Sequence, residues 1–131
     1  MQNRLNQNDV TNRVNVEDPA RVRDAVMAVY AARYPGIDLA PITQAFADFQ
    51  ALFEGAYPGF LACDTLYHDM RHTLDMTLAL ARLVDGHDSS CAAPDRLGPR
   101  RAVLGVLIAL LHDSGYLRRS AESAIENGAV F

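Results

Sequence analysis

Apolar residues recur every three or four positions along most of the chain, which is the spacing of amphipathic helices. A first helix is predicted from Asp18 to about Tyr34. Asp18 is a capping residue, a proline follows it at the first helical position, and a Pro-Gly pair follows Tyr34. A second helix is predicted from about Pro41 to Gly55, because its apolar residues form one stripe: Ile42, Ala45, Phe46, Phe49, Leu52 and Phe53.

A third helix is predicted over roughly residues 66–84, with Asp64 or Thr65 as its cap. Leu66, Met70, Thr77, Ala81 and Val84 would form its core-facing stripe. The polar stretch 86–94 is predicted to be a loop. It contains His87, for which we expect no functional role.

A fourth helix is predicted from Asp95 or Pro99 to Leu111. Residues 102–111, AVLGVLIALL, are apolar on every side. Leucine and alanine dominate this segment, and it is long for a strand, so the pattern favours a central buried helix. A short last helix is expected over residues 119–127, with a glycine at its end.

These elements predict an all-α fold with a single domain. A chain of 131 residues can build one hydrophobic core but not two. Residues 1–16 carry no periodic apolar pattern and are expected to form a flexible N-terminal arm. Residues 17–131 would form the helical domain, and the hydrophobic fraction of 50% is typical of a globular protein.

Charge and cysteine content limit the classes of function. The net charge of -4 argues against a general nucleic-acid binder, because such proteins usually carry a basic excess. Cys63 and Cys91 form no C-x-x-C pair, so we expect reduced, inert thiols. The longest apolar run, residues 102–111, is too short to cross a bilayer, and no signal peptide is recognisable. We therefore expect a cytoplasmic protein without a membrane partner.

The third predicted helix carries a group of metal-binding residue types. His68, His72 and Asp75 are four and three positions apart, and this spacing puts all three on one helix face. Imidazole is a good ligand for zinc, iron or manganese, and a carboxylate can orient a ligating histidine through its other ring nitrogen. Two histidines at this spacing are also common as surface residues or as hydrogen-bonded core residues, so this reading stays open.

The doublet His112-Asp113 follows directly on the ten apolar residues of the fourth helix. Burying an imidazole beside a carboxylate is costly unless the two are paired or bind a metal. The Ser114-Gly115 pair indicates a helix end, where neighbouring side chains can reach one ion. The alternative is a histidine favoured by the helix dipole next to a solvated aspartate.

Taken together, the two stretches resemble the HD-domain superfamily of metal-dependent phosphohydrolases. The signature of that superfamily is a histidine, then a His-Asp doublet, then a distant aspartate. His72 matches the first histidine and His112-Asp113 match the doublet, within the sequence HDSGY. Residues 67–75 are also similar to the Y-H-N-x-x-H-x-x-D helix of cyclic-nucleotide phosphodiesterases, with Asp69 in place of the asparagine. The resemblance covers roughly residues 60–120.

The resemblance implies a helical HD-type domain with one or two divalent ions, zinc, manganese, iron or magnesium. The metal ligands would be His72, His112 and Asp113. Asp75 would interact with a ligating histidine without binding the metal itself. His68 would act as the catalytic acid that protonates the leaving oxygen. The implied activity is metal-assisted hydrolysis of a nucleotide or another small phosphate ester.

The sequence departs from the superfamily pattern after the doublet. The final aspartate should lie on a later helix, whereas the acidic residues that follow Asp113, Glu122 and Glu126, match no part of the pattern. We therefore expect a domain that lacks its C-terminal helix or helices. Core surface left exposed in this way would be covered in a homodimer.

Two other functions fit the same pattern. One is a non-catalytic module that keeps the HD fold for ligand binding or partner contact, and it would fold without metal. The other is an iron-dependent oxygenase on the same fold. Arg71, Arg118 and Arg119 would contact phosphate if they line the cleft, although arginines at such positions are more often solvated.

Overall fold

The computed structural model describes residues 5–122, and within that range the chain is helical and has no strand. The predicted all-α class is therefore confirmed. The long helices are α1 (Pro19–Arg33), α2 (Ala40–Glu54), α3 (Met70–Ser90) and α4 (Gly98–Leu111). Three short 3₁₀ turns follow α3 and α4: η1 (Ala93–Asp95), η2 (Ser114–Tyr116) and η3 (Ser120–Glu122).

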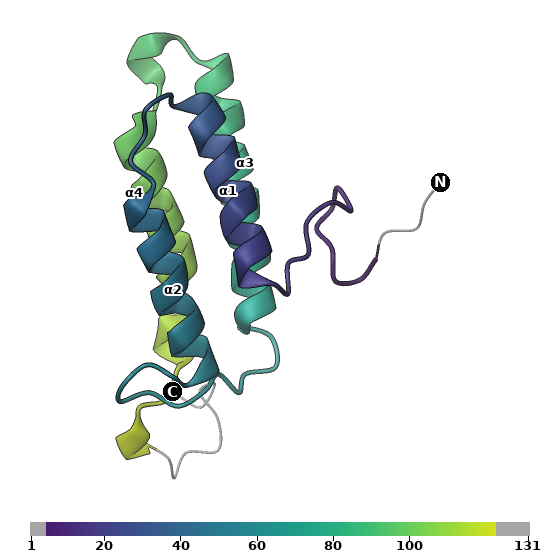
Figure 1. The fold of residues 1–131 in the computed structure, drawn as a ribbon, viewed down its shortest axis with the longest axis vertical. Coiled ribbons are helices and arrows are strands. Elements are labelled where there is room, and N and C mark those ends of the chain that lie inside the picture. Colours follow the sequence, from purple (N-terminus) through teal and green to yellow (C-terminus); the bar gives the residue numbers. More distant parts are fainter. Residues whose placement is uncertain (1–4, 123–131) are drawn as a thin grey trace.

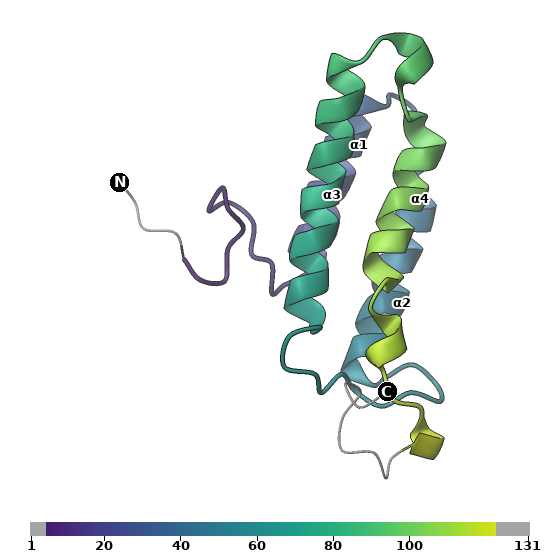
Figure 2. The ribbon, with the colours of Figure 1, turned by 180° about the vertical axis from the view of Figure 1, so that it is seen from behind.

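The four long helices form two antiparallel hairpins that pack on each other (Figure 1). α1 and α2 make the first hairpin, and α3 and α4 make the second, which faces the viewer in Figure 2. α1 lies against α3 and α2 lies against α4, each pair running in the same direction. The start of α3 and the end of α4 therefore lie at the same end of the bundle.

The core lies between the two hairpins. Ile42 and Phe49 of α2 are fully buried, and the remaining apolar residues of the predicted stripe are buried or half-buried. Burial of one such side chain stabilises the fold by about 1.5–3 kcal/mol. The Tyr30 hydroxyl donates a hydrogen bond of 3.1 Å to the carbonyl of Ala102, which joins α1 to α4 inside the core.

The predicted ends of α1 and α2 are confirmed. Asp18 caps α1, and its carboxylate accepts from the amide of Ala20 at 2.9 Å. Gly55 ends α2 in the left-handed conformation, with φ 78°. A Cβ at position 55 would lie 2.7 Å from the amide nitrogen of Ala62, so the returning loop also needs a glycine there.

The predicted limits of the third helix are wrong at both ends. α3 begins at Met70 because Asp69, rather than Asp64 or Thr65, is its cap. α3 also continues through the predicted loop to Ser90. The hydroxyls of Ser89 and Ser90 each donate to the carbonyl of Gly86 at 2.8 Å, so these polar side chains are satisfied within the helix.

The prediction of a fully buried fourth helix is also wrong. Only Ala102, Val106 and Leu110 of α4 are buried. Leu104 and Ile108 are 55% and 60% exposed, on the face of α4 that points away from the bundle. Each helix of this arrangement packs mainly against two neighbours, and no element among residues 5–122 covers the outer side of α4.

Residues 5–16, part of the expected flexible arm, form a closed turn around Asp9 beside the bundle (Figure 1). The Asp9 carboxylate is buried and accepts hydrogen bonds from Thr11, from the Val14 amide and from Arg82 of α3. Burial alone would raise the pKa of Asp9, but these hydrogen bonds hold it well below its ordinary value. The turn is therefore tied to α3 by an ionised carboxylate.

The expected last helix, 119–127, is described only as far as η3, and the rest of it lies outside the described residues. Glu126 lies there as well. Among the helices of residues 5–122, none combines the length and the apolar character that a membrane span requires.

Candidate metal centre

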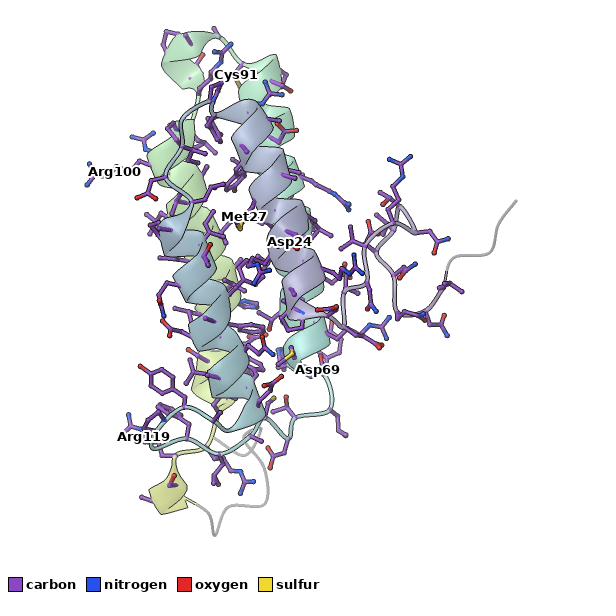
Figure 3. All side chains as sticks on the ribbon, viewed as in Figure 1. Asp24, Met27, Asp69, Cys91, Arg100 and Arg119 are labelled. Atoms are coloured by element: carbon purple, nitrogen blue, oxygen red, sulfur yellow. The ribbon has the colours of Figure 1, made fainter. Side chains whose placement is uncertain are left out.

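Four of the predicted site residues come together at the end of the bundle where α3 begins and α4 ends. Figure 3 labels Asp69, which marks the start of α3 at this end. His68 and His72 lie on either side of this cap, and His112 and Asp113 follow the last residue of α4.

The Asp69 cap determines how the two histidines of the first stretch are placed. Its carboxylate accepts from the amide of His72 at 2.8 Å, which starts the helix and leaves His68 in the loop before it. The expectation that His68 lies on the helix is therefore wrong. Its ring still reaches the neighbourhood of His72, with 5.5 Å between the ring centroids, because the loop turns back at the cap.

A short pairing of two loop segments holds the site together. The amide of Leu61 donates to the carbonyl of Arg118 at 2.9 Å, and the amide of Ser120 donates to the carbonyl of Gly59 at 2.9 Å. The Arg118 guanidinium also pairs with Asp64 at 2.5 Å. The loop that carries His68 is thus fastened to the segment that follows the His-Asp doublet.

The centre of the site is one carboxylate oxygen, Oδ2 of Asp113. It lies 2.9 Å from Nδ1 of His68, 3.1 Å from Nε2 of His112 and 3.4 Å from Nε2 of His72. Asp113 is only 7% exposed, whereas the three imidazoles keep part of their surface in solvent. Three partly exposed imidazole rings therefore surround a buried carboxylate.

The tautomer of His112 follows from its backbone contact. Its Nδ1 lies 2.7 Å from the carbonyl oxygen of Ala109, and a carbonyl can only accept, so Nδ1 carries a proton. In a neutral ring Nε2 is then a bare lone pair, and it faces the Asp113 oxygen at 3.1 Å. Two acceptors at this distance need a shared cation or a proton on one of the two groups.

The spacing of the donor atoms fits a metal ion. Ligands bonded to one ion at about 2.1 Å lie roughly 3.0–3.4 Å apart in octahedral or tetrahedral geometry. The three distances from Asp113 Oδ2, between 2.9 and 3.4 Å, fall in or next to this range. Donor atoms of His68, His72 and Asp113 all lie within 4.8 Å of one another, so these residues could hold a metal ion.

Aromatic rings fix the orientation of two of the imidazoles. The ring of Tyr116 stacks on His68, with centroids 4.3 Å apart and an angle of 9° between the planes. The Tyr67 ring lies 4.7 Å from that of His72. These ring contacts, one stacked and one tilted, limit the rotation of the two imidazoles and hold their nitrogens toward Asp113. The sequence argument assigned no role to Tyr116, although it lies within the quoted HDSGY stretch.

The remaining predicted residues lie farther from Asp113 or are paired elsewhere. Asp75 is exposed, one turn beyond His72, and in the described part of the chain no hydrogen bond joins it to a histidine. Arg71 pairs with Glu17 at 3.5 Å and donates to the carbonyl of Asn6. It therefore faces the N-terminal turn.

Several hollows lie around the candidate centre. One of about 790 Å³ includes Ser114 and Gly115 but none of the four clustered side chains. His72 and Asp75 line a smaller one of about 310 Å³, and His112 lines a third of about 330 Å³. The chemistry of the donor set, and not the size of a hollow, identifies the site, and the hollow beside His72 gives access to it.

Comparison with protein-family models, with curated proteins and with solved structures found no match to this chain.

Proposed function

We propose that the chain is a metal-dependent phosphohydrolase of the HD type that acts on a small phosphate ester, such as a nucleotide. The observation that carries the proposal is the convergence of three imidazole nitrogens on one buried oxygen of Asp113. The same residues give the resemblance to the superfamily signature. The first histidine lies at the start of α3 and the His-Asp doublet follows the end of α4, and the antiparallel packing of these helices brings them together.

His72 and Asp113 would hold the ion. The third ligand would be His112, as the resemblance implies, or His68, whose donor atom lies within 4.8 Å of those of His72 and Asp113. A bound divalent ion would supply a Lewis acid that activates water and withdraws charge from a phosphoryl oxygen. Asp113 contributes the negative charge, and because it is buried this charge is poorly screened by solvent. The hydrogen bond from His112 to Ala109 keeps Nε2 of that ring available as a ligand.

His68 has two chemically different roles open to it. Its Nδ1 contacts Asp113 at 2.9 Å, and its side chain is 34% exposed. As a ligand, it would bind the ion together with His72. As a general acid, it would hold the Asp113 contact through Nδ1 and give a proton from Nε2 to the leaving oxygen. His68→Gln separates the two roles, because loss of a ligand lowers metal content whereas loss of the acid lowers only turnover.

The test is hydrolysis of a chromogenic phosphodiester and a chromogenic phosphomonoester by the chain after loading with manganese or zinc. We expect metal-dependent turnover that falls at least about 100-fold in Asp113→Asn. His87→Asn is the matched control, since His87 lies at the other end of α3 and should not affect turnover. Turnover that Asp113→Asn leaves unchanged would contradict the proposal.

A non-catalytic helical module is the second candidate. It is favoured by the exposed apolar side chains Leu104 and Ile108 on α4, since such a face is typical of a contact surface. It also fits the His68–Asp113 contact of 2.9 Å, which is an ordinary hydrogen-bond length that needs no ion. This candidate predicts folding without metal and no turnover with either ester.

A further inference from the structure

A second cluster of reactive side chains lies at the opposite end of the bundle. Figure 3 labels Cys91 there, at the end of α3, far from Asp69. Cys91 Sγ lies 3.4 Å from Nε2 of His87, and Nδ1 of His87 lies 2.9 Å from Oδ1 of Asp88. A thiol, an imidazole and a carboxylate are thus connected in series. His72 and His87 are separated by about 22 Å along the helix, so the cluster is separate from the metal centre.

Asp88 is the fixed point of this cluster. It is 1% exposed, and it accepts from the Tyr34 hydroxyl at 2.6 Å and from the amides of Leu97 and Gly98 at 2.8 and 2.9 Å. Burial works to raise the pKa of Asp88, but the hydrogen bonds, with His87 among the donors, hold it well below its ordinary value. Asp88 is therefore an ionised acceptor that three helices keep in place.

The ionised carboxylate determines the tautomer of His87. A carboxylate can only accept, so the proton of the 2.9 Å contact lies on Nδ1 of His87. Nε2 of a neutral ring then carries a lone pair, and the sulfur of Cys91 lies 3.4 Å from it. The S–H group of Cys91 consequently donates to His87. A nucleophile, an imidazole base and a third group that orients the base form one of the recurring arrangements by which side-chain nucleophiles are activated.

The setting of Cys91 adds to this arrangement. Cys91 is half-buried and follows the last residue of α3, so its sulfur is not enclosed in the core. The guanidinium of Arg96 donates to the Cys91 carbonyl at 3.2 Å, which places a positive charge beside the residue. A nearby cation is a common feature of reactive cysteines.

Cys63 provides a contrast within the same molecule. It is also half-buried, but its sulfur lies 3.4 Å from the Thr65 hydroxyl and 3.5 Å from the carbonyl of His68. Neither group can remove the thiol proton at neutral pH. The two cysteines are therefore similar in exposure and different in chemistry.

We propose that Cys91 is a nucleophilic thiol, activated by His87 and oriented by Asp88, and that it is a modification site for small electrophiles. With iodoacetamide, the sulfur attacks the methylene carbon, the S–C bond forms, the C–I bond breaks and iodide leaves. The thiol proton moves to Nε2 of His87. The resulting imidazolium is stabilised by the Asp88 carboxylate on Nδ1. This proposal departs from the expectation that Cys91 is inert and that His87 has no role.

The test is the rate of iodoacetamide labelling at each cysteine of the folded chain at pH 7, measured by peptide mass spectrometry. We expect Cys91 to label at least about tenfold faster than Cys63. His87→Asn is the variant of choice, because its amide nitrogen can replace Nδ1 toward Asp88 while Nε2 is lost. It should slow the labelling of Cys91 about tenfold or more and leave the Cys63 rate unchanged.

Cys63 serves as the internal control for folding. If His87→Asn merely loosened the bundle, both cysteines would label faster, and this result would contradict the proposal. Equal labelling rates of Cys91 and Cys63 in the unsubstituted chain would also overturn it. So would a Cys91 rate that does not change in His87→Asn.

Discussion

A single oxygen atom, Oδ2 of Asp113, explains most of the chemistry at the candidate centre. A carboxylate with so little exposure needs polar partners, and three imidazoles supply them. His112 is the most informative of the three, because its other nitrogen is committed to the carbonyl of Ala109. That contact leaves Nε2 without a proton toward Asp113 unless the ring is charged. A metal ion bound by both groups would satisfy the two acceptors.

His112→Asn tests this reading at the scale of one residue. The asparagine amide can replace Nδ1 and keep the hydrogen bond to Ala109, but it has no atom at the position of Nε2. We expect metal affinity to fall about 10-fold to 100-fold, with the unfolding free energy of the metal-free chain changed by no more than about 1 kcal/mol. Calorimetric titration with zinc and urea unfolding measure the two quantities. Unchanged affinity would remove His112 from the ligand set.

At the scale of helices, N-cap residues and buried hydrogen bonds determine where the functional groups lie. Asp69 starts α3 at Met70 and so leaves His68 in the loop. Asp88 ties the end of α3 to Tyr34 and to the start of α4. One capping aspartate and one buried aspartate thus organise the two ends of the same helix.

Asp69→Ala removes the cap of α3. We expect a loss of about 1 kcal/mol in unfolding free energy, which is the usual contribution of an N-cap side chain. Metal affinity should fall as well, because the loop that carries His68 is no longer held at the helix start. Asp69→Ser restores a capping oxygen and should recover both quantities, as measured by urea unfolding and zinc titration. A loss of stability without any loss of metal affinity would show that the Asp69 cap does not position His68 for metal binding.

Tyr30 connects α1 to α4 and makes the fold sensitive to alkaline pH. Burial, with the charges of Asp88 and Asp85, raises the pKa of Tyr30 from 10.0 to about 12. The neutral form is therefore favoured in the fold. The contribution of Tyr30 to the free energy of unfolding is complete below pH 10 and is lost as the pH rises from 10 toward 12.

The expected result is a urea midpoint that falls above pH 10 in the unsubstituted chain and falls less steeply in Tyr30→Phe. At pH 7 the variant should lose about 1 kcal/mol, because its hydrogen bond to Ala102 is gone. Unfolding curves at pH 7, 9 and 11 test both statements. Equal pH dependence in the two proteins would assign the alkaline loss to other groups.

For the whole molecule, the capping residues and the apolar spacing of the sequence predicted the helices well. They predicted poorly which helix surfaces are buried. The Asp18 cap and the Gly55 stop were correct because each acts on its own segment. The limits of α3 were wrong because several capping residues compete before Met70, and serines that bond back to the helix look like loop residues in a sequence. The exposure of α4 was also missed, since burial depends on how many neighbours the fold supplies.

The candidate site was predictable in part for the same reason. His72 and His112-Asp113 were recognisable from their residue types and order, and the structure brings them together. The place of His68 was not predictable, because it depends on the cap and on the pairing between residues 59–61 and 118–120. The His87–Cys91 contact was missed because residues 86–94 were interpreted as a loop, and a loop does not place residues 87 and 91 one turn apart.

The most direct test of the central claim is the metal content of the purified chain after incubation with zinc or manganese, measured by elemental analysis together with calorimetric titration. We predict at least one ion per chain, lost in Asp113→Asn and retained in His87→Asn. The comparison is informative because each variant removes a charged or polar group from the end of a helix. Only Asp113→Asn changes the candidate metal centre, whereas His87→Asn changes the opposite end of α3. Equal metal content in Asp113→Asn and the unsubstituted chain would contradict the account.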